Sequence, residues 1–277
     1  MKPTLYGAPL SPFVRKARIV LAEKGIDYDL VPLDPFRKSE ELLRLSPLGR
    51  VPALVDDGKT LADSGVIAQY LEKKWPTPPL YADDPYLHAR VVWFEKYADY
   101  ELVPLCTFSV FRQRLLMPMM GQGCDEQLVQ SALQKLPAHF DYLEQQLDGA
   151  DHLIDNRLTV ADIAVASQCI NMGHGGECVD AQRWPTLAAL VERVKARPSA
   201  ADCLAQEAAI IDKIRPPLVA DEAIHWLRDV RDKSKPFFLY VCFHEPHEPI
   251  ATDDEYKKLY PSEDKSYVAH HGNITQM

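Results

Sequence analysis

The chain of 277 residues is long enough for one large domain or two of ordinary size. Charged residues make up 26% of it and the net charge is -9, which argues against a nucleic-acid binder, because such proteins carry a basic patch. No apolar run reaches membrane-spanning length and no apolar core follows Lys2, so we expect a cytoplasmic protein with neither a membrane span nor a secretion signal.

Strand and helix signals alternate through the first ~80 residues. Thr4–Tyr6 is predicted to be a strand, and Ser11 before Pro12 predicts a helix start, because the hydroxyl caps the helix and proline suits its first position. The other predicted elements are a helix over Pro12–Lys24 ended by Gly25, a strand at Tyr28–Pro32 parallel to the first, a helix at Ser39–Leu45, a hairpin of Ala53–Asp56 and Lys59–Leu61 around Asp57-Gly58, and a helix at Asp63–Lys74. This βαβ-α-ββ-α order indicates an α/β domain of thioredoxin-like type over residues 1–76.

The second part of the chain has a different character. Residues 77–86 have the proline-rich composition of a linker, and helical periodicity then dominates to about Ile214. We therefore expect an all-α domain over 87–214, and residues 215–277 form a third segment. The clearest predicted helices are Arg90–Val103, Glu126–Leu147, Val160–Met172 and Thr186–Ala196, and the glycine-rich stretch Met172–Gly176 indicates a helix end.

The six cysteines are scattered and no two are spaced as Cys-x-x-Cys. This spacing gives no support to a zinc site or a disulfide framework. Reduced thiols and no bound metal are the expectation.

Three further motifs have a structural and a functional interpretation. Pro52 precedes a strand, where a cis bond either makes an ordinary turn or exposes the backbone of Val51 to an extended peptide. Asp63-Ser64 opens a helix, either as a plain N-cap or as a pair that holds the carboxylate and ammonium of an amino acid. For Thr159 and Asp162 the spacing favours a structural capping box.

Taken together, these motifs resemble the cytosolic glutathione transferase superfamily, in its bacterial form, over about residues 4–212. The segments that carry the resemblance are Ser11–Lys16, Gly49–Leu54, Asp63-Ser64, Leu158–Ala164, Trp184–Leu187 and Ala196–Ser199. The resemblance implies a thioredoxin-like domain followed by an all-α domain. It also implies an enzyme that conjugates glutathione, its co-substrate, to a small apolar electrophile, and that forms homodimers.

By the same resemblance, Ser11 is the catalytic residue and donates a hydrogen bond to the glutathione sulfur. Val51, beside a cis Pro52, pairs with the cysteinyl backbone, while Asp63 and Ser64 hold the γ-glutamyl end. Serine rather than cysteine at position 11 argues against the thiol-disulfide branch of the superfamily. The glutathione-contacting residues implied are Phe13, Arg50, Val51, Pro52, Asp63 and Ser64.

Alternatives remain open at this point. In one alternative, Ser11 is only a helix cap. In another, the protein is a non-catalytic relative that acts by protein contact, as stringent starvation proteins do. Aromatic and methionine side chains at helical spacing are candidates for the electrophile pocket, although such residues more often belong to a core. They are Tyr97, Phe108, Phe111, Arg112 and Met117.

Residues from about 220 to 277 resemble an internal fragment of the sulfatase family, in which His247 would contact the sulfate. The nucleophile motif Cys-x-Pro-Ser-Arg is absent from the sequence, so sulfate-ester hydrolysis is a remote alternative. His244 and His247 are read as surface histidines. We expect this fragment to be poorly ordered or loosely docked, and its deletion to leave glutathione binding intact.

Overall fold

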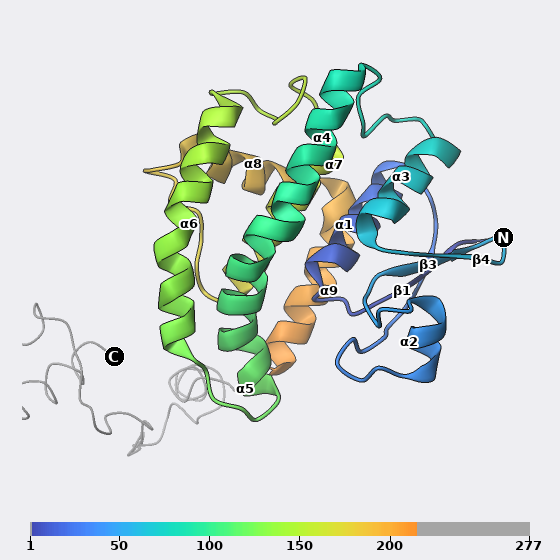
Figure 1. The fold of residues 1–277 in the computed structure, drawn as a ribbon, viewed down its shortest axis with the longest axis horizontal. Helices are drawn as coiled ribbons and strands as arrows, with labels where there is room; N and C mark the ends of the chain where they lie inside the picture. Colours follow the sequence, from blue (N-terminus) through green and yellow to red (C-terminus); the bar gives the residue numbers. More distant parts are fainter. Residues whose placement is uncertain (1, 215–277) are drawn as a thin grey trace, which may run out of the picture. The chain divides into compact units, whose positions relative to one another are not determined.

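The computed structural model describes residues 2–214. Within them, a four-stranded sheet is ordered β2-β1-β3-β4, with β2 parallel to β1 and the other neighbours antiparallel (Figure 1). The strands are β1 (Thr4–Tyr6), β2 (Asp29–Val31), β3 (Ala53–Asp56) and β4 (Lys59–Ala62). The hairpin between β3 and β4 turns at Asp57 and Gly58, both with positive φ, as the sequence predicted.

The helices of this first part are α1 (Pro12–Glu23), α2 (Glu40–Leu45) and α3 (Ser64–Lys74). Each begins after a side-chain cap: Ser11, Ser39 and Asp63 accept hydrogen bonds from first-turn N–H groups. All three helices are confirmed to within one residue of their predicted bounds. Together with the strands they give the thioredoxin-like order predicted from the sequence.

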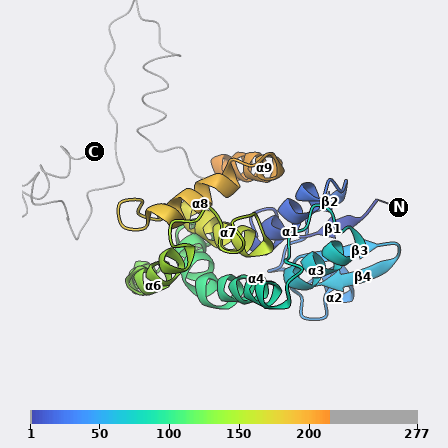
Figure 2. The same cartoon turned by 90° about the horizontal axis from the view of Figure 1, so that it is seen from above.

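The second part is helical. Its helices are α4 (Pro85–Tyr97), η1 (Ala98–Leu116), α5 (Met117–Met119), α6 (Glu126–Leu147), α7 (Val160–His174), α8 (Pro185–Lys195) and α9 (Pro198–Ile214). Helix α7 is buried along nearly its whole length. Figure 2 shows α1 between the sheet and helices α7 and α9, so the helix that begins at Ser11 contacts both parts of the chain.

The helix predicted over Arg90–Val103 is wrong in both bounds. Helix α4 begins at Pro85, capped by Asp84, and η1 carries the helical path on to Leu116. The helix passes through Pro104, which has no N–H to donate. The wider π-type hydrogen bonding of η1 accommodates this residue, and Ser109 Oγ donates to the Pro104 carbonyl at 2.8 Å.

Helix α7 begins at the predicted capping box. The N–H and the hydroxyl of Thr159 both donate to Oδ2 of Asp162, at 2.7 and 3.0 Å. The other carboxylate oxygen of Asp162 accepts from the N–H of Leu153 at 2.8 Å. Thr159 and Asp162 are fully buried, so the motif fixes the loop before α7 and the start of the helix together.

One hydrophobic core runs through both parts and includes Leu5 of the sheet, Ile19 of α1, Phe94 of α4 and Val165 of α7. A smaller cluster joins Phe111 and Leu115 of η1 to Ile211 of α9, with Leu10 and Leu116 packed against it. The shared core makes the two parts one packed unit. The division into a thioredoxin-like domain (1–76), a linker (77–86) and an all-α domain (87–214) therefore stays a prediction.

The sulfatase-like segment predicted over 215–277 lies outside the described residues, and so do His244 and His247. Among the helices of residues 2–214, none combines the length and apolar character needed to cross a membrane.

Candidate functional site

Strand register brings three of the predicted site segments to one edge of the sheet. Tyr6 at the end of β1 pairs with Ala53 at the start of β3, and Ala53 pairs with Ala62 at the end of β4. The residues that follow β1, precede β3 and follow β4 must therefore lie next to one another. These are the segments that hold Ser11, Val51-Pro52 and Asp63-Ser64.

Ser11 occupies the N-cap position of α1. Its Oγ accepts a long hydrogen bond from the N–H of Val14, at 3.4 Å, which uses an oxygen lone pair and leaves the hydroxyl proton available to a partner. The first turn of α1 contains no acidic residue, so the helix itself brings no charge that would neutralise the positive end of its dipole. Ser11 is partly exposed, and an anion at this position would meet a hydroxyl donor and a helix N-terminus.

The Val51-Pro52 bond is cis, as the family resemblance implied. A Cβ added to Gly7 would lie 3.4 Å from the Val51 Cβ and 2.4 Å from a methyl of Val14, so Val51 lies close to the start of α1. Val51 is partly exposed and Pro52 is buried. The side chain of Arg50 is exposed, and its N–H donates to Ser46 Oγ at 3.2 Å.

Asp63 and Ser64 lie where β4 passes into α3. Asp63 Oδ1 accepts from the N–H groups of Gly65 and Val66, at 2.8 and 3.3 Å, which makes it the N-cap. Its φ of 78° is unusual for a residue other than glycine and marks local backbone strain, which is common at functional sites. Ser64 is buried at the first position of α3.

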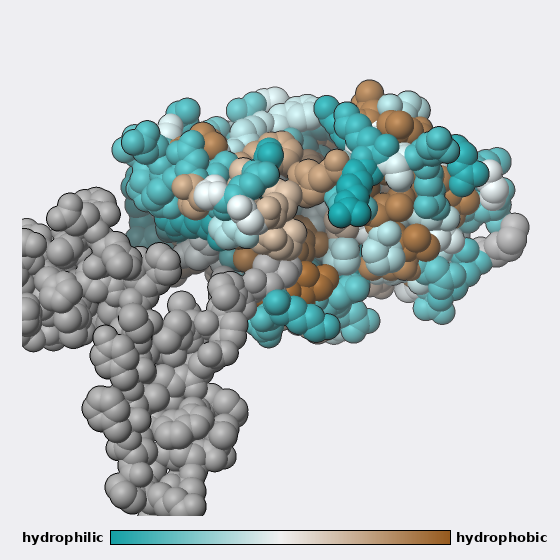
Figure 3. Space-filling view, turned by 90° about the horizontal axis from the view of Figure 1, so that it is seen from below, coloured by the Kyte–Doolittle hydropathy of each residue, from teal (hydrophilic) through white to brown (hydrophobic). Residues whose placement is uncertain are grey.

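The structure separates the residues predicted for an electrophile pocket. Phe111 belongs to the smaller apolar cluster, against which Leu10, the neighbour of Ser11, packs. Tyr97 instead faces α6, where its hydroxyl lies 2.6 Å from His139 Nδ1. The face seen from below carries apolar residues near its middle, between hydrophilic margins (Figure 3). Phe108 and Arg112 are exposed on η1, while Phe13 and Met117 are partly exposed.

A buried charged cluster behind Ser11 was missed by sequence reasoning. Arg15, one turn into α1, donates from Nε and Nη2 to the two oxygens of Glu207 on α9, at 2.8 and 2.6 Å. Both side chains are fully buried. Burial raises the pKa of Glu207, but the charge of Arg15 and a hydrogen bond with His174 outweigh it, so the pKa lies below its ordinary value. No local signal pointed to this cluster, because charged residues in a helix ordinarily indicate a solvated face.

A second buried cation, Lys16, contacts the helical part from the same helix. Its Nζ donates to Glu95 at 3.0 Å and to Asp99 at 2.7 Å. The two carboxylates outweigh the effect of burial, so the pKa of Lys16 is raised. Burial also raises the pKa of Asp99, against the pull of Lys16. These contacts join α1 to α4 and η1.

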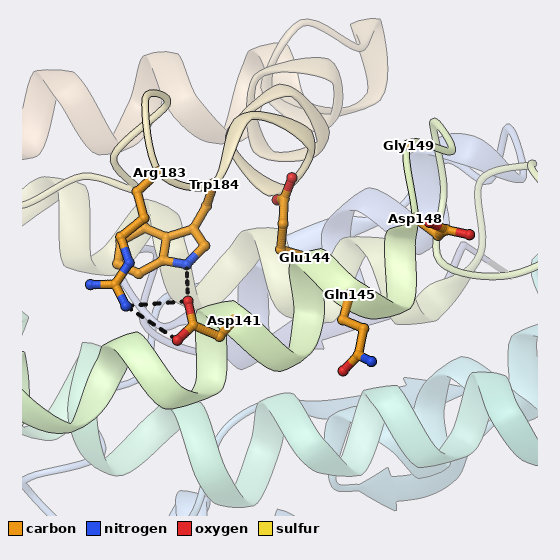
Figure 4. A pocket seen from close by; sticks show the side chains of 7 residues that line it. All are labelled: Asp141, Glu144, Gln145, Asp148, Gly149, Arg183 and Trp184. Atoms are coloured by element: carbon orange, nitrogen blue, oxygen red, sulfur yellow. Dashed lines mark hydrogen bonds and ion pairs between the residues drawn. The ribbon is translucent and has the colours of Figure 1, made fainter.

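Figure 4 shows an open depression between α6 and the segment before α8, lined by Asp141, Glu144, Gln145, Asp148, Gly149, Arg183 and Trp184. Its polar groups serve the fold. Asp141 accepts from Trp184 Nε1 at 2.7 Å, and Glu144 accepts from the N–H groups of Thr186 and Leu187 at the start of α8. None of its lining residues belongs to the segments around Ser11, so we assign it no chemistry.

Two family models match the chain: "Glutathione S-transferase, N-terminal domain" over residues 5–79 and "Glutathione S-transferase, C-terminal domain" over residues 120–207. Maleylacetoacetate isomerase of Rattus norvegicus is 32% identical over 193 residues, which cover 67% of this chain and 84% of the relative. Uncharacterized GST-like protein YibF of Escherichia coli (strain K12) is 35% identical over 199 residues, which cover 70% and 95% of the two chains.

Among solved structures, the crystal structure of a glutathione S-transferase from Rhodospirillum rubrum F11 matches with a TM-score of 0.68 and 30% sequence identity. The match covers 73% of this chain and 91% of that one. Sequence and fold therefore agree over the thioredoxin-like and the helical part. The chain belongs to the glutathione S-transferase family and is a glutathione transferase.

Proposed function

We propose that the chain binds glutathione at the sheet edge, with its sulfur at Ser11, and transfers the thiolate to a small apolar electrophile. The observation that supports the proposal is the pairing of β1, β3 and β4, since the segments with Ser11, Val51 and Asp63 adjoin neighbouring ends of these strands. Each segment offers a different group: a hydroxyl donor, a backbone edge and a carboxylate. Together they match the thiol, the peptide backbone and the amino-acid end of glutathione.

Activation of the thiol is the step that Ser11 would assist. A free thiol has a pKa of about 8.5, and lowering it by about two units requires about 2.7 kcal/mol of preferential stabilisation of the thiolate. A hydroxyl donor together with the N-terminus of α1, whose first turn holds no acidic residue, would supply that energy. Because the thiolate is the nucleophile, the fraction of ionised thiol sets the rate of attack on the electrophile at neutral pH.

The remainder of glutathione would follow the sheet edge. The backbone of Val51 would pair with the cysteinyl residue as an added strand, beside Pro52. The ammonium of the γ-glutamyl end would bind Asp63, and its carboxylate would bind the hydroxyl and N–H of Ser64 at the N-terminus of α3. Phe13, in the first turn of α1, and Arg50, next to Val51 in the chain, complete the proposed set.

The electrophile would approach from the side of the helical part. Leu10, next to Ser11, packs against the cluster of Phe111, Leu115 and Ile211. Leu10 is itself partly exposed, and an apolar side chain next to the reacting sulfur favours a small apolar substrate. From the family we also expect a homodimer in the cytoplasm.

A second candidate reaction is glutathione-dependent isomerisation, favoured by the 32% identity to a maleylacetoacetate isomerase over 84% of that relative. The thiolate would add to a conjugated double bond, the new single bond would rotate, and the thiolate would leave again. This reaction returns glutathione unchanged, whereas conjugation consumes it. Titration of free thiol during turnover of maleylacetoacetate therefore distinguishes the two reactions.

The first test is calorimetry of glutathione binding across pH, for the native protein and for Ser11→Ala. We expect the native protein to bind and to release a proton near neutral pH, and the variant to lose or shift that release. Binding without proton release would leave a protein that holds glutathione for other chemistry. No binding would favour the non-catalytic alternative that acts by protein contact.

A further inference from the structure

The buried pair of Arg15 and Glu207 joins the helix that begins at Ser11 to the last described helix of the chain. Arg15 uses two of its nitrogens on the carboxylate, in the bidentate geometry that gives the strongest orientation. Its third nitrogen, Nη1, donates to the carbonyl of Ser167 on α7 at 2.7 Å. One side chain of α1 is therefore held by α7 and α9 at once.

His174, at the end of α7, closes the cluster. Its Nε2 lies 2.8 Å from Oε2 of Glu207 and 3.4 Å from Nη2 of Arg15. One turn earlier on α7, the buried Asn171 donates to the carbonyl of Leu10 at 3.4 Å. Helix α7 thus contacts both Arg15 of α1 and Leu10, the residue that precedes Ser11.

The stability of the fold does not require such a pair. Removing two charges from water costs free energy that their attraction often fails to return, and apolar replacements of similar volume are frequently neutral or stabilising. What an apolar contact lacks is direction, since packing tolerates small slides and rotations of one helix on another. A bidentate pair with a third, carbonyl partner defines one position of α1 along α7 and α9.

Neither side chain can touch a substrate, because both are fully buried. Their effect must pass through α1, whose first turn contains the Ser11 cap and the N–H of Arg15 bound to the Ser11 carbonyl at 2.9 Å. On the other side of this turn, Leu10 meets the cluster of Phe111 and Ile211. A shift of α1 would move the serine hydroxyl relative to the surface that faces the electrophile.

We infer that Arg15 and Glu207 are positioning residues, which hold Ser11 in register with the helices that face the electrophile. The inference rests on the proposed role of Ser11 for its effect on catalysis. Its structural part, a fixed position of the first turn of α1, stands without that role and can be measured separately.

The test compares the native full-length chain with the double variant Arg15→Met/Glu207→Leu. We expect a urea midpoint equal to or above that of the native protein and a glutathione affinity within about twofold. We expect kcat with 1-chloro-2,4-dinitrobenzene to fall about tenfold, because small misplacements of reacting groups are costly. Amide hydrogen exchange at Phe13 and Val14 should be faster in the variant.

The matched control is a second ion pair between α1 and the N-terminal side of α9. There Arg197 contacts Glu23 at 2.5 and 2.8 Å, at the far end of α1 from Ser11. Arg197→Met/Glu23→Leu should leave kcat and exchange at Phe13 unchanged. A third variant, Arg15→Lys, keeps the positive charge but cannot bind both oxygens of Glu207 with two nitrogens. Its kcat should lie between those of the native protein and the double variant.

Three results would overturn the inference: an unchanged kcat and unchanged exchange in the double variant, an equal loss in the control pair, or unfolding of the double variant, which would assign the pair to stability. If the native protein fails to bind glutathione, the role of Ser11 is refuted. Exchange at Phe13 and Val14 then still decides whether Arg15 and Glu207 fix the first turn of α1.

Discussion

The Oγ of Ser11 and the N–H of Val14 are joined by a hydrogen bond of 3.4 Å at the start of α1. The bond gives Ser11 a structural role, as the N-cap, whatever else it does. In the proposed mechanism, the same hydroxyl donates a hydrogen bond to the glutathione sulfur. Cap and donor are thus one group, and a single alanine substitution removes both.

A pair of substitutions separates the two roles of Ser11. Ser11→Ala should cost about 1 kcal/mol of stability through loss of the cap. Ser11→Asp keeps a good cap and should retain native stability, but it places a negative charge beside the sulfur. We expect both variants to lose transferase activity, with Asp at least as poor as Ala. Native activity in Ser11→Asp would show that the cap alone matters.

The capping box before α7 should behave differently. Thr159→Ala removes the hydroxyl that donates to Asp162 at 3.0 Å in a fully buried site. Stability should fall by about 1 kcal/mol or more, measured by urea unfolding, because a buried acceptor loses a partner. The Michaelis constant for glutathione should not change. A variant as stable as the native protein would refute the structural assignment.

Local chemistry explains what the sequence could predict. The caps at Ser11 and Asp63 and the Asp57-Gly58 turn each act within a few residues, and the structure has each of them at the position the sequence indicated. The strand order could also be anticipated, because a βαβ unit and a hairpin leave few arrangements. That order also determines which strand ends the segments with Ser11, Val51-Pro52 and Asp63-Ser64 adjoin.

Long-range pairing explains what the sequence could not predict. Arg15 and Glu207 are 192 positions apart, and no local pattern announces their contact. Charged side chains in a helix ordinarily indicate a solvated face, yet Arg15 and Lys16 are buried. Pro104 is a similar case, since a proline ordinarily ends a helix and here the hydrogen bonding widens instead.

Gly7 is required by the close approach of β1 to the first turn of α1. A Cβ at this position would lie 2.4 Å from a methyl of Val14, which is fully buried and cannot move aside. Gly7→Ala should cost about 1–3 kcal/mol in urea unfolding, as overpacking does. It should also weaken glutathione binding if Val51, 3.4 Å from the same Cβ, lies in the site.

The control for Gly7 is Gly173, in α7, where an added Cβ would meet no atom within 4 Å. Gly173→Ala should be neutral or stabilise the protein by up to about 1 kcal/mol, because alanine favours the helix. Equal losses at Gly7 and Gly173 would contradict the steric argument.

Acid should destabilise the native protein partly through Glu207. Its pKa is lowered in the folded state, so as pH falls below the ordinary value of 4.5 the unfolded chain binds the proton first. The stabilisation is therefore present above 4.5 and is lost as pH falls through the folded pKa. Urea midpoints should decline more steeply with acid in the native protein than in Arg15→Met/Glu207→Leu.

Other carboxylates with a lowered pKa also make the folded protein less stable in acid. The pKa of Glu23 is lowered by Arg197 and Ser199 against the effect of burial, and that of Glu126 is lowered to about 2, mainly by Arg114. Both remain in the double variant, so only the difference between the two pH curves reports on Glu207. Superimposable curves would show that Glu207 has no depressed pKa.

A chain that ends at residue 217 should bind glutathione within about twofold of the full-length protein and unfold at the same urea concentration. Every residue of the proposed site and of the Arg15–Glu207 pair lies within residues 2–214. The truncation also removes the apolar run Phe237–Phe243, so solubility should improve. Failure of this shorter chain to fold would refute the expectation.

A chain that ends at residue 203 is the contrasting case. It lacks Glu207 and Ile211, so Arg15 would remain buried without its carboxylate and the small apolar cluster would lose a member. An uncompensated buried charge of this kind costs about 3–5 kcal/mol. Stability should therefore drop sharply between the ends at 217 and 203. Equal stability of the two truncated chains would mean that α9 contributes little to holding α1, and would remove the structural basis for its role in positioning Ser11.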